Sequence, residues 1–115
     1  MQIANVNTDN GIARSAGMKD VYLDILESFI EDGNERKIDL KQSLDSENLG
    51  AYDIHAHGIK SALYIIGADE MSQTASDLEM AAKSGDIEFI KANNDTFVEL
   101  LSTLVKDVQQ FLDKQ

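Results

Sequence analysis

Two histidines, His55 and His57, lie two residues apart and are the only imidazoles of the chain. An imidazole can act near neutral pH as a nucleophile, a general acid or base, or a metal ligand. Successive helical residues turn by about 100°, so a helix centred on Ile59 would point the two side chains differently. His55 falls within roughly 60° of that apolar centre, whereas His57 falls about 160° away. We therefore expect His55 to be a packed, hydrogen-bonded residue and His57 to be exposed.

The neighbours of His57 suit an exposed reactive group. Lys60 and Ser61 follow it at i+3 and i+4, and thus share its helix face. The lysine places positive charge where an anion on His57 would sit, and the small serine leaves room for another protein. Gly58 costs about 1 kcal/mol of helix stability against alanine. We interpret this cost as a sign that bulk is unwelcome beside the imidazole.

Other kinds of functional site need groups that this sequence does not provide. A metal centre needs more ligands than two histidines that point apart, and the chain has no cysteine. A serine hydrolase needs a nucleophile on a strained turn and an oxyanion hole, which a straight helix does not offer. The phosphate-binding patterns GxxxxGK[ST] and GxGxxG are both absent. An imidazole that is itself the nucleophile, acting on a substrate brought by a partner, remains.

Composition limits the class of protein. The 115 residues are expected to form one domain, residues 1–115, with 21 acidic against 10 basic residues and a net charge of -11. Such a surface repels phosphate backbones and anionic membranes, so we expect neither nucleic acid nor membrane as a partner. The polar N-terminus does not resemble a signal peptide, and no apolar run approaches the roughly 20 residues of a membrane span. A soluble, cytoplasmic protein is expected.

The absence of proline and the apolar spacing favour helices throughout. A helix from Met18 is predicted to stop near the breaker cluster Asp32-Gly33-Asn34. A second helix, or a kinked continuation of the first, follows to about Asp45-Ser46, and Ser46 is expected to cap the next helix. Further helices are predicted over 52–66, 69–84 and 87–112, with a short leading helix capped by Thr8 or Asp9.

The connections between these segments are short. The third long helix is expected to end at Gly67-Ala68, the next at Ser84-Gly85, and Asp86 is expected to cap the last. The apolar stripe from Leu100 to Leu112 is interpreted as core. Short connections make consecutive helices antiparallel. The predicted fold is therefore all-α, an antiparallel four-helix bundle with a short extra N-terminal helix.

The residues around His57 also resemble a known family. The stretch His57-Gly58-Ile59-Lys60-Ser61-Ala62, followed by Gly67-Ala68, is similar to the signature of histidine-containing phosphotransfer (HPt) domains. Segments 11–14, 22–32 and 78–86 look like other parts of bacterial members, so the resemblance covers nearly the whole chain. Ser61 departs from the glycine most common at its position. The family fold is an antiparallel four-helix bundle, in agreement with the helical pattern.

The resemblance implies roles for three residues. His57 would be the phosphoacceptor, Lys60 would stabilise the phosphoryl oxygens, and Glu79 would orient the imidazole. A carboxylate that accepts from Nδ1–H would leave Nε2 as the nucleophile. Alternatively, Glu79 merely pairs with Lys83 at i+4.

The resemblance also implies partners. Receiver domains of response regulators would bring an aspartyl phosphate and their own Mg²⁺, and a hybrid sensor histidine kinase is a further partner. The chain itself would need no cofactor, would lack ATP-dependent kinase activity and would be a monomer. The expected docking surface comprises Ile54, Gly58, Ser61, Tyr64 and Ala68. Two alternatives stay open: a non-catalytic helical docking module, and the dimerisation and phosphoacceptor domain of a histidine kinase.

Overall fold

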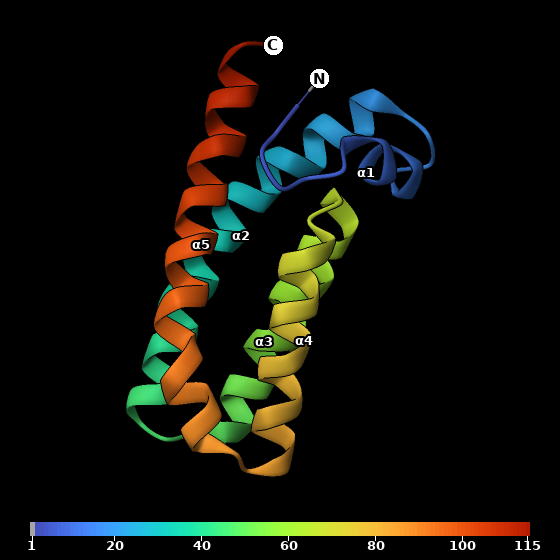
Figure 1. The fold of residues 1–115 in the computed structure, drawn as a ribbon. Coiled ribbons are helices and arrows are strands. Elements are labelled where there is room, and N and C mark those ends of the chain that lie inside the picture. Colours follow the sequence, from blue (N-terminus) through green and yellow to red (C-terminus); the bar gives the residue numbers. More distant parts are fainter. Residues whose placement is uncertain (1) are drawn as a thin grey trace.

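Four long helices pack side by side, and a short fifth helix lies across one end of them (Figure 1). The structure, a computed structural model, describes residues 2–115. Consecutive long helices run antiparallel, and the molecule measures 41 × 22 × 18 Å. The helices of this part are α1 Thr8–Arg14, α2 Lys19–Asp45, α3 Leu49–Ile66, α4 Asp69–Ser84 and α5 Ile87–Asp113. The predicted all-α bundle with an extra N-terminal helix is confirmed.

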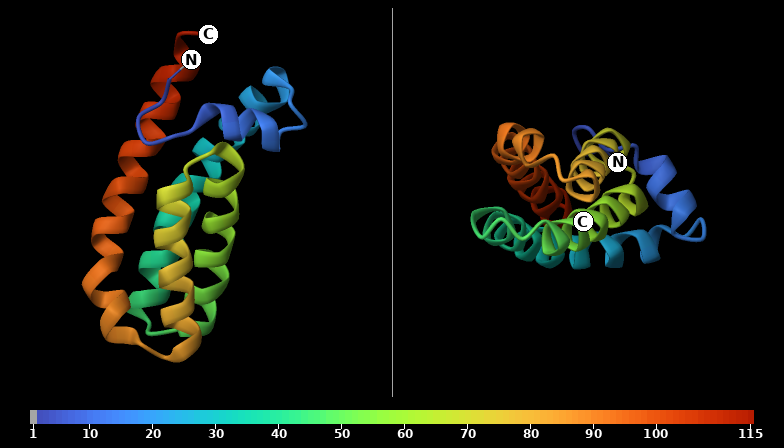
Figure 2. Two further views of the ribbon diagram at one scale, coloured as in Figure 1. Left: turned by 45° about the vertical axis from the view of Figure 1, so that its right-hand side comes forward. Right: turned by 90° about the horizontal axis from the view of Figure 1, so that it is seen from below.

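The N-terminal segment is tied to the turn between α3 and α4 (Figure 2). Asn7 N–H donates to the Gly67 carbonyl at 2.9 Å. Gly67 has a φ of 93°, and a Cβ there would stand 2.1 Å from the Asn7 carbonyl oxygen. Only glycine fits both the left-handed backbone and this close approach. The predicted end of the helix at Gly67 is thus confirmed, and it also seats α1 against the bundle.

The prediction of a stop near Asp32-Gly33-Asn34 is wrong, because α2 continues as one helix to Asp45. Gly33 is buried, and a Cβ there would lie 2.9 Å from a methyl group of Val105 on α5. The glycine lets α2 and α5 approach closely, and the packing outweighs its low helix propensity of about 1 kcal/mol. Because α2 is unbroken, one chain supplies all four long helices of the bundle.

Two of the predicted caps are also wrong. Asn48, not Ser46, caps α3 by accepting from Ala51 N–H, while the Ser46 hydroxyl donates back to the Gln42 carbonyl of α2. Asn7, rather than Thr8 or Asp9, caps α1 by accepting from Asn10 N–H. In both cases an asparagine one or two residues away takes the N-cap position that this residue type favours.

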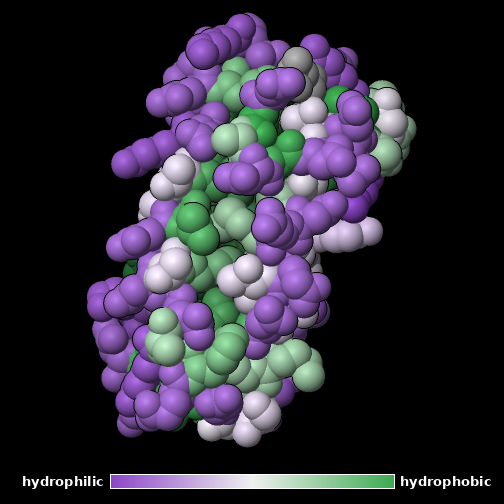
Figure 3. Space-filling view, in the orientation of Figure 1, coloured by the Kyte–Doolittle hydropathy of each residue, from purple (hydrophilic) through white to green (hydrophobic). Residues whose placement is uncertain are grey.

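The last helix begins and packs largely as expected. Asp86 accepts from Phe89 N–H at 3.1 Å, which confirms it as the cap of α5. Leu101, Leu104 and Val108 are buried, but Leu100, expected in the core, is exposed. Leu100 lies at the edge of the buried face and lines a shallow hollow beside α4. Figure 3 shows apolar residues in a strip along α4 and α5 on an otherwise largely hydrophilic face.

Candidate functional site

The two histidines of α3 point in different directions, as the helical arithmetic predicts. The side chain of His57 is 61% exposed. His55 is partly buried against α2, where its Nδ1 lies 2.8 Å from Arg36 Nη1 and 3.6 Å from Asp39 Oδ2. Arginine can only donate, so Nδ1 of His55 accepts this hydrogen bond. His55 is thus a packed, hydrogen-bonded residue, and His57 is the imidazole open to a partner.

Glu79 on α4 is hydrogen-bonded to the imidazole ring of His57 on α3. Its Oε2 lies 2.7 Å from Nδ1 of His57, although the two residues are 22 positions apart in the chain. The carboxylate itself is buried, with 3% of its side chain exposed. The alternative pairing is present as well, since Lys83 Nζ lies 3.3 Å from the same oxygen. Glu79 therefore contacts both the imidazole and the lysine of its own helix.

Two lysines keep this buried carboxylate ionised. Lys60 Nζ lies 2.5 Å from Glu79 Oε1, and Lys83 adds a bond to Oε2. Burial raises the pKa of Glu79, but hydrogen bonds from Lys60, His57 and Lys83 outweigh it and lower the pKa to about 2. A buried carboxylate is tolerated when it is paired and hydrogen-bonded in this way. Glu79 is consequently an anion at neutral pH.

An ionised carboxylate can only accept, so the proton of the His57–Glu79 hydrogen bond belongs to Nδ1. The tautomer follows from this network of partners. In the neutral ring, Nε2 then carries the lone pair, on the side of the imidazole away from Glu79. The arrangement can therefore present an oriented nitrogen nucleophile at the surface of a helix bundle.

Lys60 lies close to the imidazole, but its ammonium group is already bound. Its side chain crosses from α3 to Glu79 on α4, and the Ser72 hydroxyl donates to its backbone carbonyl at 3.0 Å. A lysine ammonium has three donors, so one salt bridge does not exhaust it. Lys60 thus combines a structural contact with a positive charge next to His57.

The structure explains the glycine at position 58 by a contact within the molecule. A Cβ there would lie 2.6 Å from Nη2 of Arg36, whose guanidinium covers the α3 backbone beside His57. The glycine thus leaves room for a side chain of α2, in addition to any room that it leaves for a partner. Sequence reasoning did not identify Arg36, because only the crossing of α2 over α3 brings it to this position. The small residue at 58 is the one local signal of such a close contact.

Three of the five predicted docking residues lie open around His57. Ile54 and Tyr64 are 67% and 52% exposed, and Ser61 is exposed with its hydroxyl donating to the His57 carbonyl. Ala68 is wrong as a docking residue, because it is fully buried. An open hollow between α3 and α4 adjoins this surface, lined by Lys60, Ser61, Tyr64, Ile65 and Ser72.

Residues 2–115 contain neither a metal-binding cluster nor a membrane-spanning helix. No group of three or more histidine or acidic side chains in this range is arranged to hold a metal ion. None of its helices is both long enough and apolar enough to cross a membrane.

Comparison with known proteins places this geometry in context. The model of the Hpt domain family matches residues 24–113. The solved HPT domain of an Hpt sensor hybrid histidine kinase from Shewanella has a TM-score of 0.87 and 15% identity, with 96% of each chain covered. Histidine-containing phosphotransfer protein B (HptB) from Pseudomonas aeruginosa PAO1 has a TM-score of 0.77 and 19% identity, covering 98% of this chain and 95% of that one. No curated protein sequence gives a significant match.

Proposed function

The chain belongs to the Hpt domain family, and from this premise we propose that His57 is the residue that carries the phosphoryl group. Hpt domains are histidine phosphotransfer modules of two-component phosphorelays, and this chain is such a module. The observation that carries the choice of residue is the 2.7 Å contact between Nδ1 of exposed His57 and buried Glu79. His55, the other histidine, has its Nδ1 occupied by Arg36 on the flank facing α2.

The reaction begins when a receiver domain brings its aspartyl phosphate to α3. Nε2 of neutral His57 attacks phosphorus, a P–N bond forms, and the P–O bond to the aspartate breaks as the carboxylate leaves. The ring keeps its Nδ1 proton and becomes cationic. Ionised Glu79, at 2.7 Å, stabilises this charge, and the same steps in reverse pass the group to a second receiver.

The bundle contributes position and charge. Glu79 fixes the ring, and Lys60 supplies positive charge to the phosphoryl oxygens through donors that its salt bridge leaves available. We propose that the Mg²⁺ ion that neutralises these oxygens belongs to the receiver. The chain needs no cofactor and has no ATP-dependent kinase activity of its own.

The partners follow from the same proposal. Response-regulator receivers, and a hybrid sensor histidine kinase as a further partner, dock over Ile54, Ser61 and Tyr64 around the imidazole. Burying this patch gives a small, transient interface of the kind that exchanges partners readily. We further propose that residues 1–115 act as one cytoplasmic module that binds neither nucleic acid nor membranes.

Phosphotransfer from a panel of phosphorylated receivers tests the proposal, with wild type, His57→Gln and His55→Gln compared. Phosphoramidate serves as a second donor that needs no docking: its P–N bond breaks, a bond to Nε2 forms and ammonia leaves. We expect acid-labile label on wild type and His55→Gln, and none on folded His57→Gln. Label that persists on His57→Gln would reject the choice of residue. A wild type that binds receivers but accepts label from neither donor would instead be a non-catalytic docking module.

A further inference from the structure

Arg14 on α1 packs against Tyr64, the aromatic residue of the docking surface. The Arg14 guanidinium carbon lies 3.7 Å from the centroid of the Tyr64 ring. Nη1 of Arg14 donates to the Tyr64 carbonyl and to Asp69 Oδ1, both at 2.5 Å. Asn10 adds a bond to the other oxygen of Asp69 at 3.2 Å. The guanidinium is therefore fixed by α3 and α4 while it covers one face of the ring.

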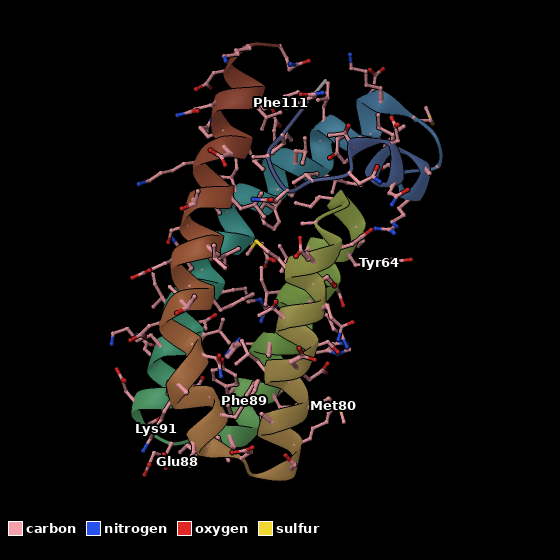
Figure 4. All side chains as sticks on the ribbon, in the orientation of Figure 1. Tyr64, Met80, Glu88, Phe89, Lys91 and Phe111 are labelled. Carbon is pink, nitrogen blue, oxygen red and sulfur yellow. The ribbon has the colours of Figure 1, made fainter. Side chains whose placement is uncertain are left out.

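This contact limits the positions that the Tyr64 side chain can adopt. The residue is 52% exposed, so without Arg14 little would restrict its rotation. A ring that is already held in place loses less conformational entropy when a partner covers it. Figure 4 shows Tyr64 pointing away from the bundle, on the flank where α1 meets α3.

Tyr64 stands two helical turns beyond His57 on the same face of α3. It also borders the open hollow that Ile65 and Ser72 help to line. A receiver that brings its aspartyl phosphate to Nε2 of His57 must cover this neighbouring surface. Tyrosine and arginine are the residue types that most often contribute the binding energy of such contacts.

We propose that Arg14 is a positioning residue that pre-orders Tyr64 for docking of a receiver domain; this inference rests on the proposed function. Through Arg14, α1 contacts both the ring and the backbone carbonyl of Tyr64, so α1 contributes to the docking face of α3. The charge of Arg14 is paired with Asp69. The arginine therefore acts on the lifetime of the complex more than on electrostatic steering of association.

A double-mutant cycle on binding tests this inference. The probe is the receiver that exchanges phosphate fastest with wild type in the panel, and Kd, association and dissociation rates are measured for Arg14→Ala, Tyr64→Ala and the double variant. Lys91→Ala is the matched control, because it also removes one cation and one surface ion pair, at the far end of the bundle (Figure 4). We expect Kd to rise about three- to tenfold for Arg14→Ala, mainly through faster dissociation. In the Tyr64→Ala background the same change should add less than about twofold.

Phosphoramidate labelling separates this inference from the proposed function. Arg14→Ala should accept label from phosphoramidate at the wild-type rate, because that donor needs no docking. Should Arg14→Ala fail to fold, Arg14→Lys replaces it in the cycle, since it keeps a cation for Asp69 and removes the planar group over the ring. An unchanged Kd, or a loss that stays the same size without Tyr64, would overturn the role of Arg14. Failure of every receiver to bind while phosphoramidate labels His57 would overturn the docking surface alone.

Discussion

At the scale of single residues, the site depends on a buried carboxylate that serves three donors at once. Glu79 binds the imidazole through Oε2, Lys60 through Oε1 and Lys83 through Oε2 again. A neutral residue of the same shape would keep a contact with the ring and lose the attraction to both ammonium groups. The charge of Glu79 is therefore separable from its size.

Replacing Glu79 by glutamine should slow phosphorylation of His57 by about ten- to a hundredfold, because the ring loses its fixed orientation and a stabilising anion. Phosphoramidate labelling of folded protein measures this rate without any effect on docking. Lys83→Ala is the control, since it removes a neighbour of Glu79 and keeps the 2.7 Å contact with His57. Equal rates for Glu79→Gln and wild type would show that Glu79 has only a structural role.

The same carboxylate should make stability depend on pH. Although burial opposes it, hydrogen bonding from Lys60, His57 and Lys83 lowers the pKa of Glu79 from 4.5 to about 2 on folding. Between these values the unfolded chain binds the proton more readily, so the contribution is complete above pH 4.5 and is lost as the pH falls toward 2. Urea unfolding should show wild type exceeding Glu79→Gln in stability most at neutral pH and least near about pH 3. A difference that does not change with pH would contradict this linkage.

The sequence predicts which residues form the site, but it predicts only some of the contacts between them. Spacing on one helix face predicts that His57 and Lys60 are neighbours, and the family resemblance predicts the role of Glu79. Gly58 signals a close contact, but the sequence does not show that Arg36 makes it, because only the packing of α2 against α3 brings the two residues together. Its place after the end of α3 suggests that Ala68 is exposed, whereas it is fully buried next to Gly67, the residue to which the N-terminal segment is hydrogen-bonded.

At the scale of helices, glycines mark where elements approach one another. Gly33 lies where α2 approaches α5, and Gly67 lies where the end of α3 approaches the N-terminal segment. Local pattern reading identifies the second, because a glycine after a periodic apolar run is a common helix end. The same reading wrongly predicts a helix break at Gly33, because the close packing of Gly33 against Val105 is a tertiary contact that the local sequence does not show. Local signals suffice where a cap decides the boundary: α3 ends at Gly67, α4 ends at Gly85 and α5 begins after Asp86, as predicted.

Gly33→Ala should therefore destabilise the protein, in spite of the better helix propensity of alanine. The added methyl group would meet Val105 at 2.9 Å, and crowding a packed interface costs typically 1–3 kcal/mol. In a Val105→Ala background the same change should become neutral or stabilising by up to about 1 kcal/mol. Urea unfolding of the four proteins measures both effects, and a destabilisation of equal size in both backgrounds would rule out the contact as its cause.

At the scale of the molecule, one chain completes the bundle. The long helices α2 to α5 bury a shared core that includes Tyr52, Ile59 and Phe97. The dimerisation domain of a histidine kinase builds its bundle from helices of two subunits, and the Hpt family match sets this chain apart from that alternative. With a net charge of -11, copies of the chain also repel one another.

We expect the protein to sediment as a monomer at concentrations up to about 100 µM, where weak self-association would already be visible. Equilibrium sedimentation at low and moderate salt measures this, because salt screens the repulsion between copies. A stable dimer at both salt concentrations would mean that an exposed apolar surface, such as the strip along α4 and α5, is an interface between copies (Figure 3).

The measurement that tests the central claim most directly is nitrogen NMR of the phosphorylated chain with labelled histidine rings. The phosphoryl group should appear, through phosphorus–nitrogen coupling, on Nε2 of His57, while Nδ1 keeps its proton in the bond to Glu79. Assignment by comparison with His55→Gln identifies the ring. Coupling at Nδ1 of His57, or at either nitrogen of His55, would contradict the claim that Glu79 presents Nε2 of His57 as the nucleophile.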